Sequence, residues 1–164
     1  SFFFLAERAV AFVRAHEQYD EARCVGFQAD LVHDALTTHV PPASLDYVTL
    51  FFCLTAITPE RFGDAIDNVR SVLKPGGAVL FRDYGAYDHA MLRFKKGQKL
   101  QDRFYVRSDG TRNYYFTIEE LSQLFTAHGF DVVSNTYVLT DTINRKMDIS
   151  VQRVFVQAKF VLRE

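Results

Sequence analysis

The sequence predicts an α/β protein with a mostly parallel sheet and an antiparallel last strand. Three observations predict it: strand-like apolar runs alternate with helical patterns up to residue 129, one run is apolar almost throughout, and two strand-like segments end the chain. Strands that alternate with helices pair in parallel, because each helix carries the chain back to the start of the next strand. Two consecutive strands need only a hairpin and therefore pair antiparallel.

The first half of the chain supplies three predicted strands and two helices. Residues 1–4 form a short apolar strand, residues 5–16 have helical spacing, and residues 24–27 form a second short strand. The segment Asp46–Leu54 is rich in Val, Tyr and Phe, which is typical of a strand buried on both faces of a parallel sheet. Thr58 and Pro59 then start a helix as N-cap and first residue, and Gly76 and Gly77 end it. The apolar residues of this helix form one stripe: Phe62, Ala65, Ile66, Val69, Val72 and Leu73.

The second half predicts a strand, an excursion, a helix and two strands. The apolar run Ala78–Phe81 is the strand, and Met91–Arg112 has little periodicity and is predicted to leave the sheet. Thr117 and Glu120 have the spacing of a capping box at a helix start, and the helix closes at Gly129. The last two predicted strands are Asp131–Leu139 and Val151–Leu162.

Length, charge and cysteine usage restrict the function classes. The 164 residues are enough for one domain, 1–164, with a sizeable core. The net charge of 19 − 20 = −1 excludes a global basic field, so nucleic acid would have to bind a local patch. Two isolated cysteines favour a reducing, cytoplasmic location, with the mitochondrion left open. The longest apolar run is far short of the roughly 20 residues that span a bilayer.

Polar and ionisable side chains gather after the strand that ends at Phe81. Ligands of open α/β sheets bind beyond the carboxyl ends of the strands, so this cluster predicts the rim of a site. The excursion that follows carries seven basic residues against Asp102 and Asp109, with the aromatic residues Phe94, Phe104 and Tyr105 interleaved. That composition suits a phosphate backbone and stacked bases, although a charge run is more often a solvated face. The rim residues are Arg82, Asp83, Tyr84, Tyr87, Asp88, His89 and Arg93.

Several motifs resemble one enzyme family. The segment LKPGG at Leu73–Gly77 is similar to the turn before the fifth strand of class I S-adenosylmethionine-dependent methyltransferases, which have a Rossmann-like sheet. The segments FRDYGAYDHAMLRF, FYVRSDGTRNYYF and RVFVQAKF resemble the methyltransferase-like enzymes that make N3-methylcytidine in the anticodon loop of tRNA. The resemblance implies S-adenosylmethionine as cofactor, the tRNA anticodon stem-loop as substrate, and an aminoacyl-tRNA synthetase such as seryl-tRNA synthetase as a partner.

The resemblance assigns roles to two groups of residues. Asp30, Leu31 and Phe51 would contact the cofactor, with Asp30 accepting from the adenine amine; the alternatives are a helix N-cap for Asp30 and a core position for Phe51. Asp83, Tyr84, Asp88, His89 and Arg93 would form the pocket of the target base. N3 of cytosine carries a lone pair and the product ring is cationic, so a carboxylate beside it would stabilise the transition state, and a tyrosine would stack on the base.

The alternative for the base-pocket residues is a purely structural role. Asp83 would pair with Arg82 or Arg93, and His89 would cap a helix. The family's glycine-rich loop has no counterpart here, and Phe4 stands where an acidic residue would bind the ribose of the cofactor. We therefore expect a partial methyltransferase domain that lacks the first strand.

Two other functions remain open: a non-catalytic module that binds RNA or a protein partner, and a methyltransferase for small molecules or proteins. No histidine and cysteine spacing suits a metal site. Cys24 and Cys53 lie in predicted apolar strands and are expected in the core.

Overall fold

The computed structural model describes residues 2–4, 7–144 and 149–164 and confirms an α/β fold. Its first half contains β1 (Phe2–Phe4), α1 (Glu7–Arg14), β2 (Val25–Phe27), β3 (Leu45–Phe51), α2 (Phe62–Val72) and β4 (Leu73–Tyr84). Its second half contains α3 (His89–Leu92), β5 (Lys99–Gln101), β6 (Phe104–Val106), β7 (Arg112–Tyr114), α4 (Ile118–Ala127), β8 (Phe130–Asn144) and β9 (Ile149–Leu162). Short 3-10 helices are η1 (Leu36–Thr38), η2 (Leu54–Ala56), η3 (Pro59–Arg61) and η4 (Lys96–Gln98).

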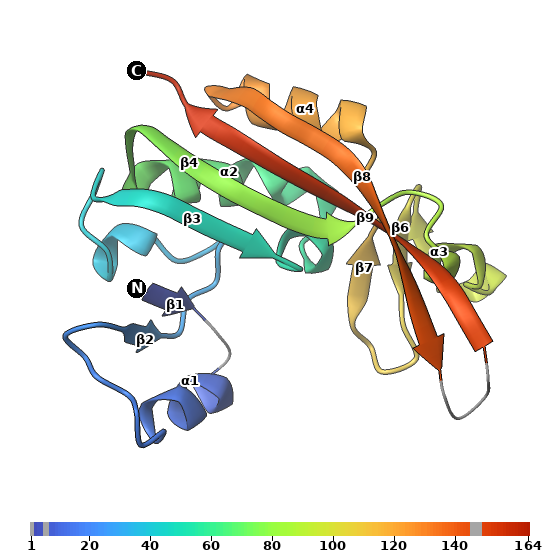
Figure 1. The fold of residues 1–164 in the computed structure, drawn as a ribbon, viewed down its shortest axis with the longest axis horizontal. Coiled ribbons are helices and arrows are strands. Elements are labelled where there is room, and N and C mark those ends of the chain that lie inside the picture. The colour runs from blue at the N-terminus through green and yellow to red at the C-terminus, as the bar shows by residue number, and fades with distance from the viewer. Residues whose placement is uncertain (1, 5–6, 145–148) are drawn as a thin grey trace.

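The main sheet has four strands in the order β3-β4-β9-β8 (Figure 1). β3 and β4 are parallel, whereas β9 runs antiparallel to both β4 and β8. β1 and β2 form a separate parallel pair, and β5, β6 and β7 form a small antiparallel sheet. The predicted alternation and the antiparallel finish are confirmed, and the excursion is an ordered subdomain rather than a plain loop.

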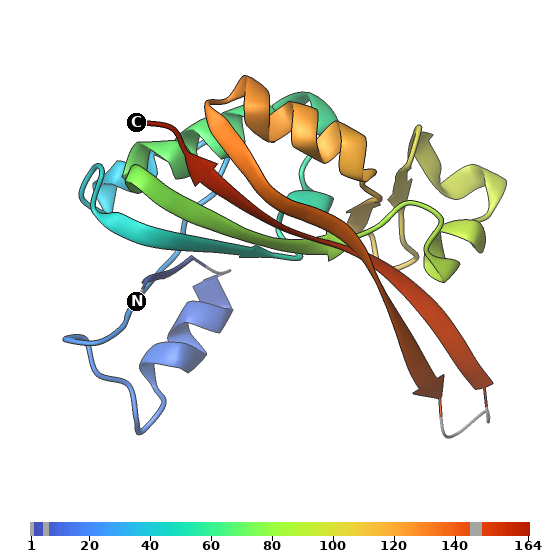
Figure 2. The same ribbon diagram turned by 45° about the horizontal axis from the view of Figure 1, so that its top comes forward.

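The core lies between the main sheet and helices α2 and α4, which cover the same face (Figure 2). The predicted apolar stripe of α2 is buried, from Phe62 to Val72. The rings of Phe125 on α4 and Phe160 on β9 stack with their centroids 3.9 Å apart, and both side chains are fully buried. Full burial of such side chains contributes roughly 1.5–3 kcal/mol each, which fixes the helices on the sheet.

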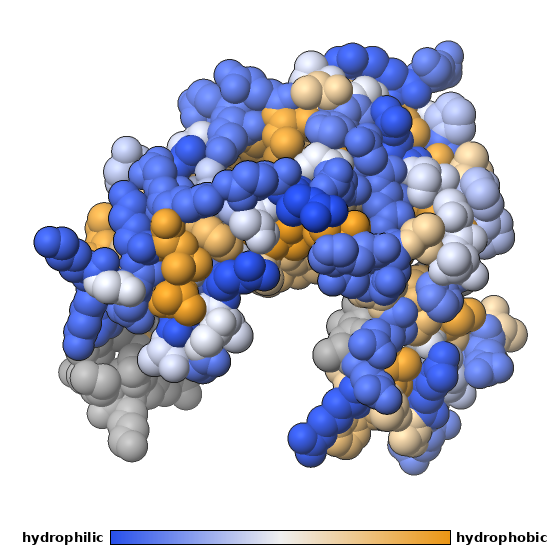
Figure 3. Space-filling view, turned by 180° about the vertical axis from the view of Figure 1, so that it is seen from behind, coloured by the Kyte–Doolittle hydropathy of each residue, from blue (hydrophilic) through white to orange (hydrophobic). Residues whose placement is uncertain are grey.

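The opposite face of the sheet is open. The prediction that Asp46–Leu54 is buried on both faces is wrong, because β3 is an edge strand and the two helices cover one face only. Tyr47 is 62% exposed and Phe51 is 54% exposed, while Val48 and Leu50 point into the core. From behind, the molecule is hollowed between the part that carries β1, β2 and α1 and the end of the β8–β9 hairpin (Figure 3).

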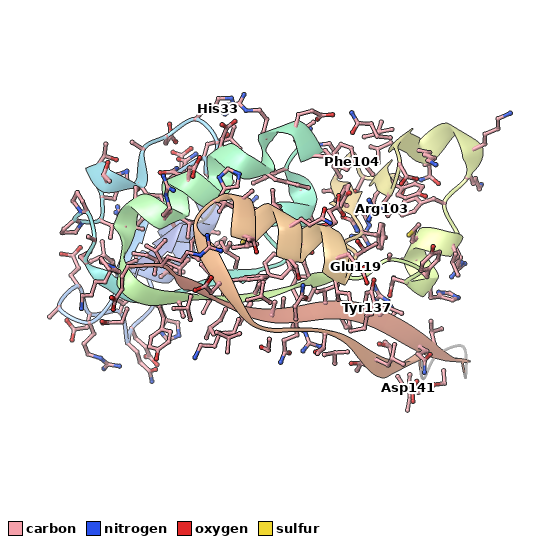
Figure 4. All side chains as sticks on the ribbon, turned by 90° about the horizontal axis from the view of Figure 1, so that it is seen from above. His33, Arg103, Phe104, Glu119, Tyr137 and Asp141 are labelled. Carbon is pink, nitrogen blue, oxygen red and sulfur yellow. The ribbon has the colours of Figure 1, made fainter. Side chains whose placement is uncertain are left out.

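The β8–β9 hairpin is longer than predicted. Both strands continue past the main sheet as a two-stranded ribbon, on which Figure 4 places Asp141 near the far end. The predicted alternation of β9 is confirmed, since Val156, Ala158 and Phe160 are all buried. Gly85 lies where this ribbon crosses the end of β4. A Cβ atom there would stand 2.9 Å from Cγ1 of Val154, so the crossing leaves room for glycine only.

The helix starts differ from prediction in detail. Thr58 precedes η3 rather than α2, and its side chain makes no capping bond; its hydroxyl instead accepts from Arg112 at 3.2 Å. Thr117 does accept from the N–H of Glu120, but the Glu120 carboxylate binds Arg103 and Tyr114 instead of closing the box. Of residues 1–16, Ser1, Leu5 and Ala6 lie outside the described residues. α1 buries Val10, while Phe12 is 68% exposed.

No helix in the described ranges has the length and apolar character that crossing a membrane would require.

Candidate functional site

The predicted rim residues lie at the carboxyl ends of β3 and β4, which are neighbours in the sheet. Phe51 pairs with Arg82 in the parallel register, so the loops that follow the two strands emerge at the same edge. The N–H of Phe52 donates to the carbonyl of Arg82 at 2.9 Å and joins the two loops. The N–H of Gly85 donates to Val154 at 2.9 Å, which brings β9 to the same place. The fold therefore gathers three chain segments at this edge.

Asp83 is fully buried at the end of β4. Its carboxylate accepts from the N–H of Thr55 at 3.1 Å and from its neighbour Tyr84 at 2.9 Å. The Thr55 hydroxyl bonds the backbone of Tyr114 in turn, so Asp83 holds the loop after β3 against β7. Burial raises the pKa of Asp83 to about 7, because the hydrogen bonds offset only part of the desolvation of the charge.

Asp88 is also fully buried, and it joins α3 to β9. Its Oδ2 accepts from Nε of Arg153 at 2.8 Å and from the N–H of Val154 at 2.8 Å. Its Oδ1 accepts from the N–H of Ala90 at 2.9 Å, which makes Asp88 the N-cap of α3. Asp88, and not His89, is therefore the residue that caps this helix.

The predicted ion pair of Asp83 with Arg82 or Arg93 is not observed among the described residues. Arg82 donates instead to Oε1 of Gln157 at 2.9 Å, and its guanidinium lies 4.9 Å from the ring centroid of Phe155. Both aspartates are shielded from solvent, so a bound base would meet them only if they gave up some of these bonds. Their catalytic role stays a prediction.

Aromatic rings and Arg153 form a cluster around Tyr84. The Tyr84 ring lies 5.2 Å from Phe52, 6.0 Å from Phe155 and 5.7 Å from Tyr115, measured between centroids. The guanidinium of Arg153 lies 5.6 Å from the Tyr84 ring. We call Phe52, Tyr84, Phe155 and Arg153 the aromatic–arginine cluster. Such a surface can hold the face of an unpaired base by stacking and cation–π contact.

Phe52 has an unusual backbone. Its φ angle is 55°, in the left-handed region that bulky residues rarely adopt, and its side chain is 44% exposed. The hydrogen bond to Arg82 holds it there, so the chain keeps a strained aromatic residue at the carboxyl end of β3.

His89 and Arg93 come together at a cavity beside the cluster. The cavity measures about 470 Å³, and Arg107 and Arg153 also line it. The full lining is His89, Ala90, Arg93, Phe94, Gln98, Arg107, Ser108, Thr142, Val151 and Arg153. The structure thus brings Tyr84, His89 and Arg93 to one region, as predicted, with Asp83 and Asp88 buried next to them.

The aromatic residues of the excursion pack on the protein itself. Phe94 and Tyr105 stack with centroids 4.6 Å apart, and Phe104 is buried in the core. Arg103, labelled in Figure 4, donates to Oε2 of Glu120 on α4 at 2.8 Å. The prediction that all three rings interleave with bases is therefore wrong for Phe104, while the basic side chains of the excursion remain exposed at Lys95, Lys96 and Arg107.

The predicted cofactor residues follow β2 and end β3. Asp30 accepts from the N–H groups of Val32 at 2.8 Å and His33 at 3.3 Å, and the Val32 bond does most to lower the pKa of Asp30. These bonds close a turn at residues 31–33 and do not cap a helix, so the alternative of a helix N-cap is wrong. The side chain stays more than half exposed, and a carboxylate has about four acceptor sites. Leu31 is buried and Phe51 is exposed. These residues fit the adenosine end of S-adenosylmethionine; the Phe4 side chain lies outside the described residues.

Sequence reasoning missed Phe52, Phe155 and Arg153. Arg153 and Phe155 stand in the RVFVQAKF segment, but an alternating strand gives no sign that its start lies against the end of β4. Cys24 and Cys53 are free and half-buried. Within the described ranges, no three His, Cys, Asp or Glu side chains come together as a metal site would require.

Comparisons with known proteins agree on the type of domain. A family model described as a methyltransferase domain matches residues 7–135. The tRNA N(3)-cytidine methyltransferase METTL6 of Mus musculus is 55% identical over 93% of this chain and 54% of its own length, and that of Pongo abelii is 53% identical over 94% and 55%. A SAM-dependent methyltransferase from Methanosarcina mazei has a TM-score of 0.69 at 19% identity, covering 99% of this chain and 81% of its own. The chain thus spans about half the length of the curated relatives it matches.

The Asp88–Arg153 pair predicts an unequal cost for two aspartate substitutions. Asp131 binds Nε of Arg163 at 2.7 Å, in nearly the same geometry as Asp88 and Arg153, but it is 66% exposed. Asp88→Asn should lower the free energy of unfolding by about 3 kcal/mol or more, because it leaves the partly buried guanidinium of Arg153 without its counter-charge. Asp131→Asn should lower it by no more than about 1 kcal/mol, because that ion pair is exposed. Urea denaturation of the two variants measures both. Equal losses would show that burial adds nothing to the first pair.

Proposed function

This chain belongs to the methyltransferase-domain family, and we propose that it forms part of an enzyme that methylates N3 of cytidine in the anticodon loop of tRNA. Identity of 53–55% to two tRNA N(3)-cytidine methyltransferases supports the reaction and the substrate. The observation that carries the proposal is the aromatic–arginine cluster at the carboxyl ends of β3 and β4, where this fold places ligands and where a single unpaired base can stack.

We propose that the base lies against Tyr84 and Phe52. S-adenosylmethionine, when bound, supplies the electrophilic methyl group. The lone pair of N3 forms the new N–CH₃ bond, the S–CH₃ bond breaks, and its electron pair leaves with sulfur. No proton must be removed from N3, so the site needs no strong base. The protein contributes by orienting the base toward the methyl group and by stabilising the positive charge that develops on the ring.

We propose that the buried carboxylates of Asp83 and Asp88 act on the base through their negative charge and do not touch it. The ring becomes cationic as the methyl group arrives, and a nearby negative charge inside the protein is screened less than one in water. Asp83 is the last residue but one of β4 and directly precedes Tyr84, and Asp88 orients Arg153 beside the Tyr84 ring. His89 and Arg93 line the adjoining cavity and complete the pocket.

At the cofactor end, Asp30 would accept from the adenine amine, Leu31 would contact the adenine, and Phe51 would line the same site. Asp30 supports this role through its exposed carboxylate, which retains free acceptor positions. We further propose that residues 1–164 act as one domain of a cytoplasmic protein. A partner such as seryl-tRNA synthetase rests on the family resemblance, and the exposed Leu139 and Ile143 of the hairpin offer it an apolar surface.

Calorimetric titration with S-adenosylmethionine tests the cofactor assignment. We expect binding by the protein as its gene encodes it, and weaker or no binding by residues 1–164 alone if upstream residues complete the site. Asp30→Ala should weaken binding, whereas Glu17→Ala, which removes an exposed carboxylate elsewhere in the first half of the chain, should not. If the whole gene product did not bind S-adenosylmethionine, the proposed enzyme function would be wrong and the non-catalytic RNA-binding module would be favoured.

Stacking on Tyr84 predicts different effects for two substitutions. Tyr84→Phe keeps the ring and should methylate an anticodon stem-loop transcript nearly as fast as the wild type. Tyr84→Ala should lower kcat/KM by roughly 5- to 150-fold, since stacking on a base is worth about 1–3 kcal/mol. Rates come from incorporation of labelled methyl groups. Equal rates for the alanine and phenylalanine variants would show that the base does not lie on this ring.

Charge on Asp83 predicts a pH dependence. Because its pKa is about 7, the carboxylate is mainly protonated at pH 6 and mainly ionised at pH 8. The single-turnover rate should therefore rise through pH 7 in the wild type and be lower and flat in Asp83→Asn. Circular dichroism and urea denaturation of each variant confirm that folded protein is compared. A wild-type rate that does not change with pH, or an unchanged rate in the variant, would remove Asp83 from the catalytic set.

A further inference from the structure

The cavity beside the aromatic–arginine cluster collects three arginines from separate parts of the chain. Arg93 ends α3, Arg107 follows β6, and Arg153 lies on β9, so sequence distance hides the grouping. Their side chains share a cavity of about 470 Å³ with the polar side chains of Gln98, Ser108 and Thr142. Three guanidinium groups at one concave site repel one another and call for an anionic ligand.

Arg153 is held in place with donors to spare. Its Nε binds Asp88 at 2.8 and 3.2 Å, and its guanidinium also lies 5.5 Å from the Phe155 ring. An arginine has five N–H donors. Among the described residues, the terminal nitrogens of Arg153 have no hydrogen-bond partner, so up to four donors remain for a ligand. Asp88 thus acts as a positioning residue that fixes the fork.

Arg93 and Arg107 lie at the surface of the cavity. Within the described parts of the chain, neither forms an ion pair with a carboxylate. The turn after β6 holds Arg107, because its N–H donates to Thr111 at 2.8 Å and its carbonyl accepts from Gly110 at 3.0 Å. The nearby Asp109 is bound by the N–H and hydroxyl of Thr111. Both arginines are therefore available to a ligand.

We propose that this cavity binds a backbone phosphate of single-stranded RNA, next to the nucleotide whose base stacks on Tyr84. Arg153 links the two parts, since it lines the cavity and lies over the Tyr84 ring. Planar guanidinium forks suit the paired oxygens of a phosphate, and a stacking surface beside a basic groove is how proteins hold unpaired strands. This inference rests on the proposed function and adds the contact that fixes the strand.

Salt-dependent RNA binding tests the cavity. Fluorescence anisotropy of a labelled anticodon stem-loop is measured with the whole gene product, without S-adenosylmethionine, at several salt concentrations. Arg107→Gln and Arg93→Gln should each weaken binding, by roughly five- to tenfold at 0.1 M salt, and each should lower the salt slope by about 0.7. Arg8→Gln, an equal loss of charge on exposed α1, should change neither.

Neutral linkages locate the phosphate. A methylphosphonate is placed at one loop position at a time in a synthetic stem-loop. We expect one linkage next to the target cytidine to weaken wild-type binding, and the same linkage to have no further effect in Arg107→Gln. The proposal would be overturned if every methylphosphonate weakened binding to Arg107→Gln as much as it weakens binding to the wild type. It would also be overturned if the Arg93 and Arg107 variants bound RNA as Arg8→Gln does.

The same measurements separate this inference from the proposed function. If RNA binding depends on Arg107 but the wild type transfers no methyl group, the proposed reaction is wrong and the phosphate site is supported. Methyl transfer with RNA binding that is indifferent to Arg93 and Arg107 would keep the reaction and overturn the phosphate site.

Discussion

The buried carboxylate of Asp88 is the contact on which the candidate site depends. It accepts from Nε of Arg153, the N–H of Val154 and the N–H of Ala90, so one group joins the start of α3 to β9. These segments are more than 60 residues apart in the chain. This junction adds to the pairing of β9 with β4 and fixes the start of α3 against the ribbon. With it, Arg153 is presented to a ring on one side and to a cavity on the other.

Asp83 and Asp88 show two ways of burying a negative charge five residues apart. Asp88 is balanced by a guanidinium group, whereas Asp83 accepts from the backbone N–H groups of Thr55 and Tyr84. The result for Asp83 is a pKa raised to about 7, where a small change in surroundings changes its charge. Asp83 also organises the structure, because Thr55 connects it to Tyr114 and hence to the small antiparallel sheet. A single network therefore supports both the loop after β3 and the base of the excursion.

The described residues enclose the proposed RNA side of the site more fully than the proposed cofactor side. On the RNA side, strands, helix and excursion close around a defined cavity with rings and guanidinium groups in fixed positions. On the cofactor side, Asp30 and Phe51 stand at the ends of their strands, and Phe51 and Tyr47 of the edge strand are exposed. Edge strands with exposed apolar side chains favour pairing with a further strand.

The sequence by itself determined the order of the elements, the α2 stripe, the antiparallel finish and the position of the rim after Phe81. These features follow from local rules: hydrophobic period, capping residues and the alternation of strands with helices. It also located Tyr84, His89 and Arg93 correctly at one edge. Only the tertiary structure decided that Asp83 and Asp88 face inward, that Phe104 joins the core, and that β3 is covered on one face. Only it brought Arg107 and Arg153 to Arg93, because that grouping depends on the register of β9 against β4 and on the fold of the excursion, which no local pattern encodes.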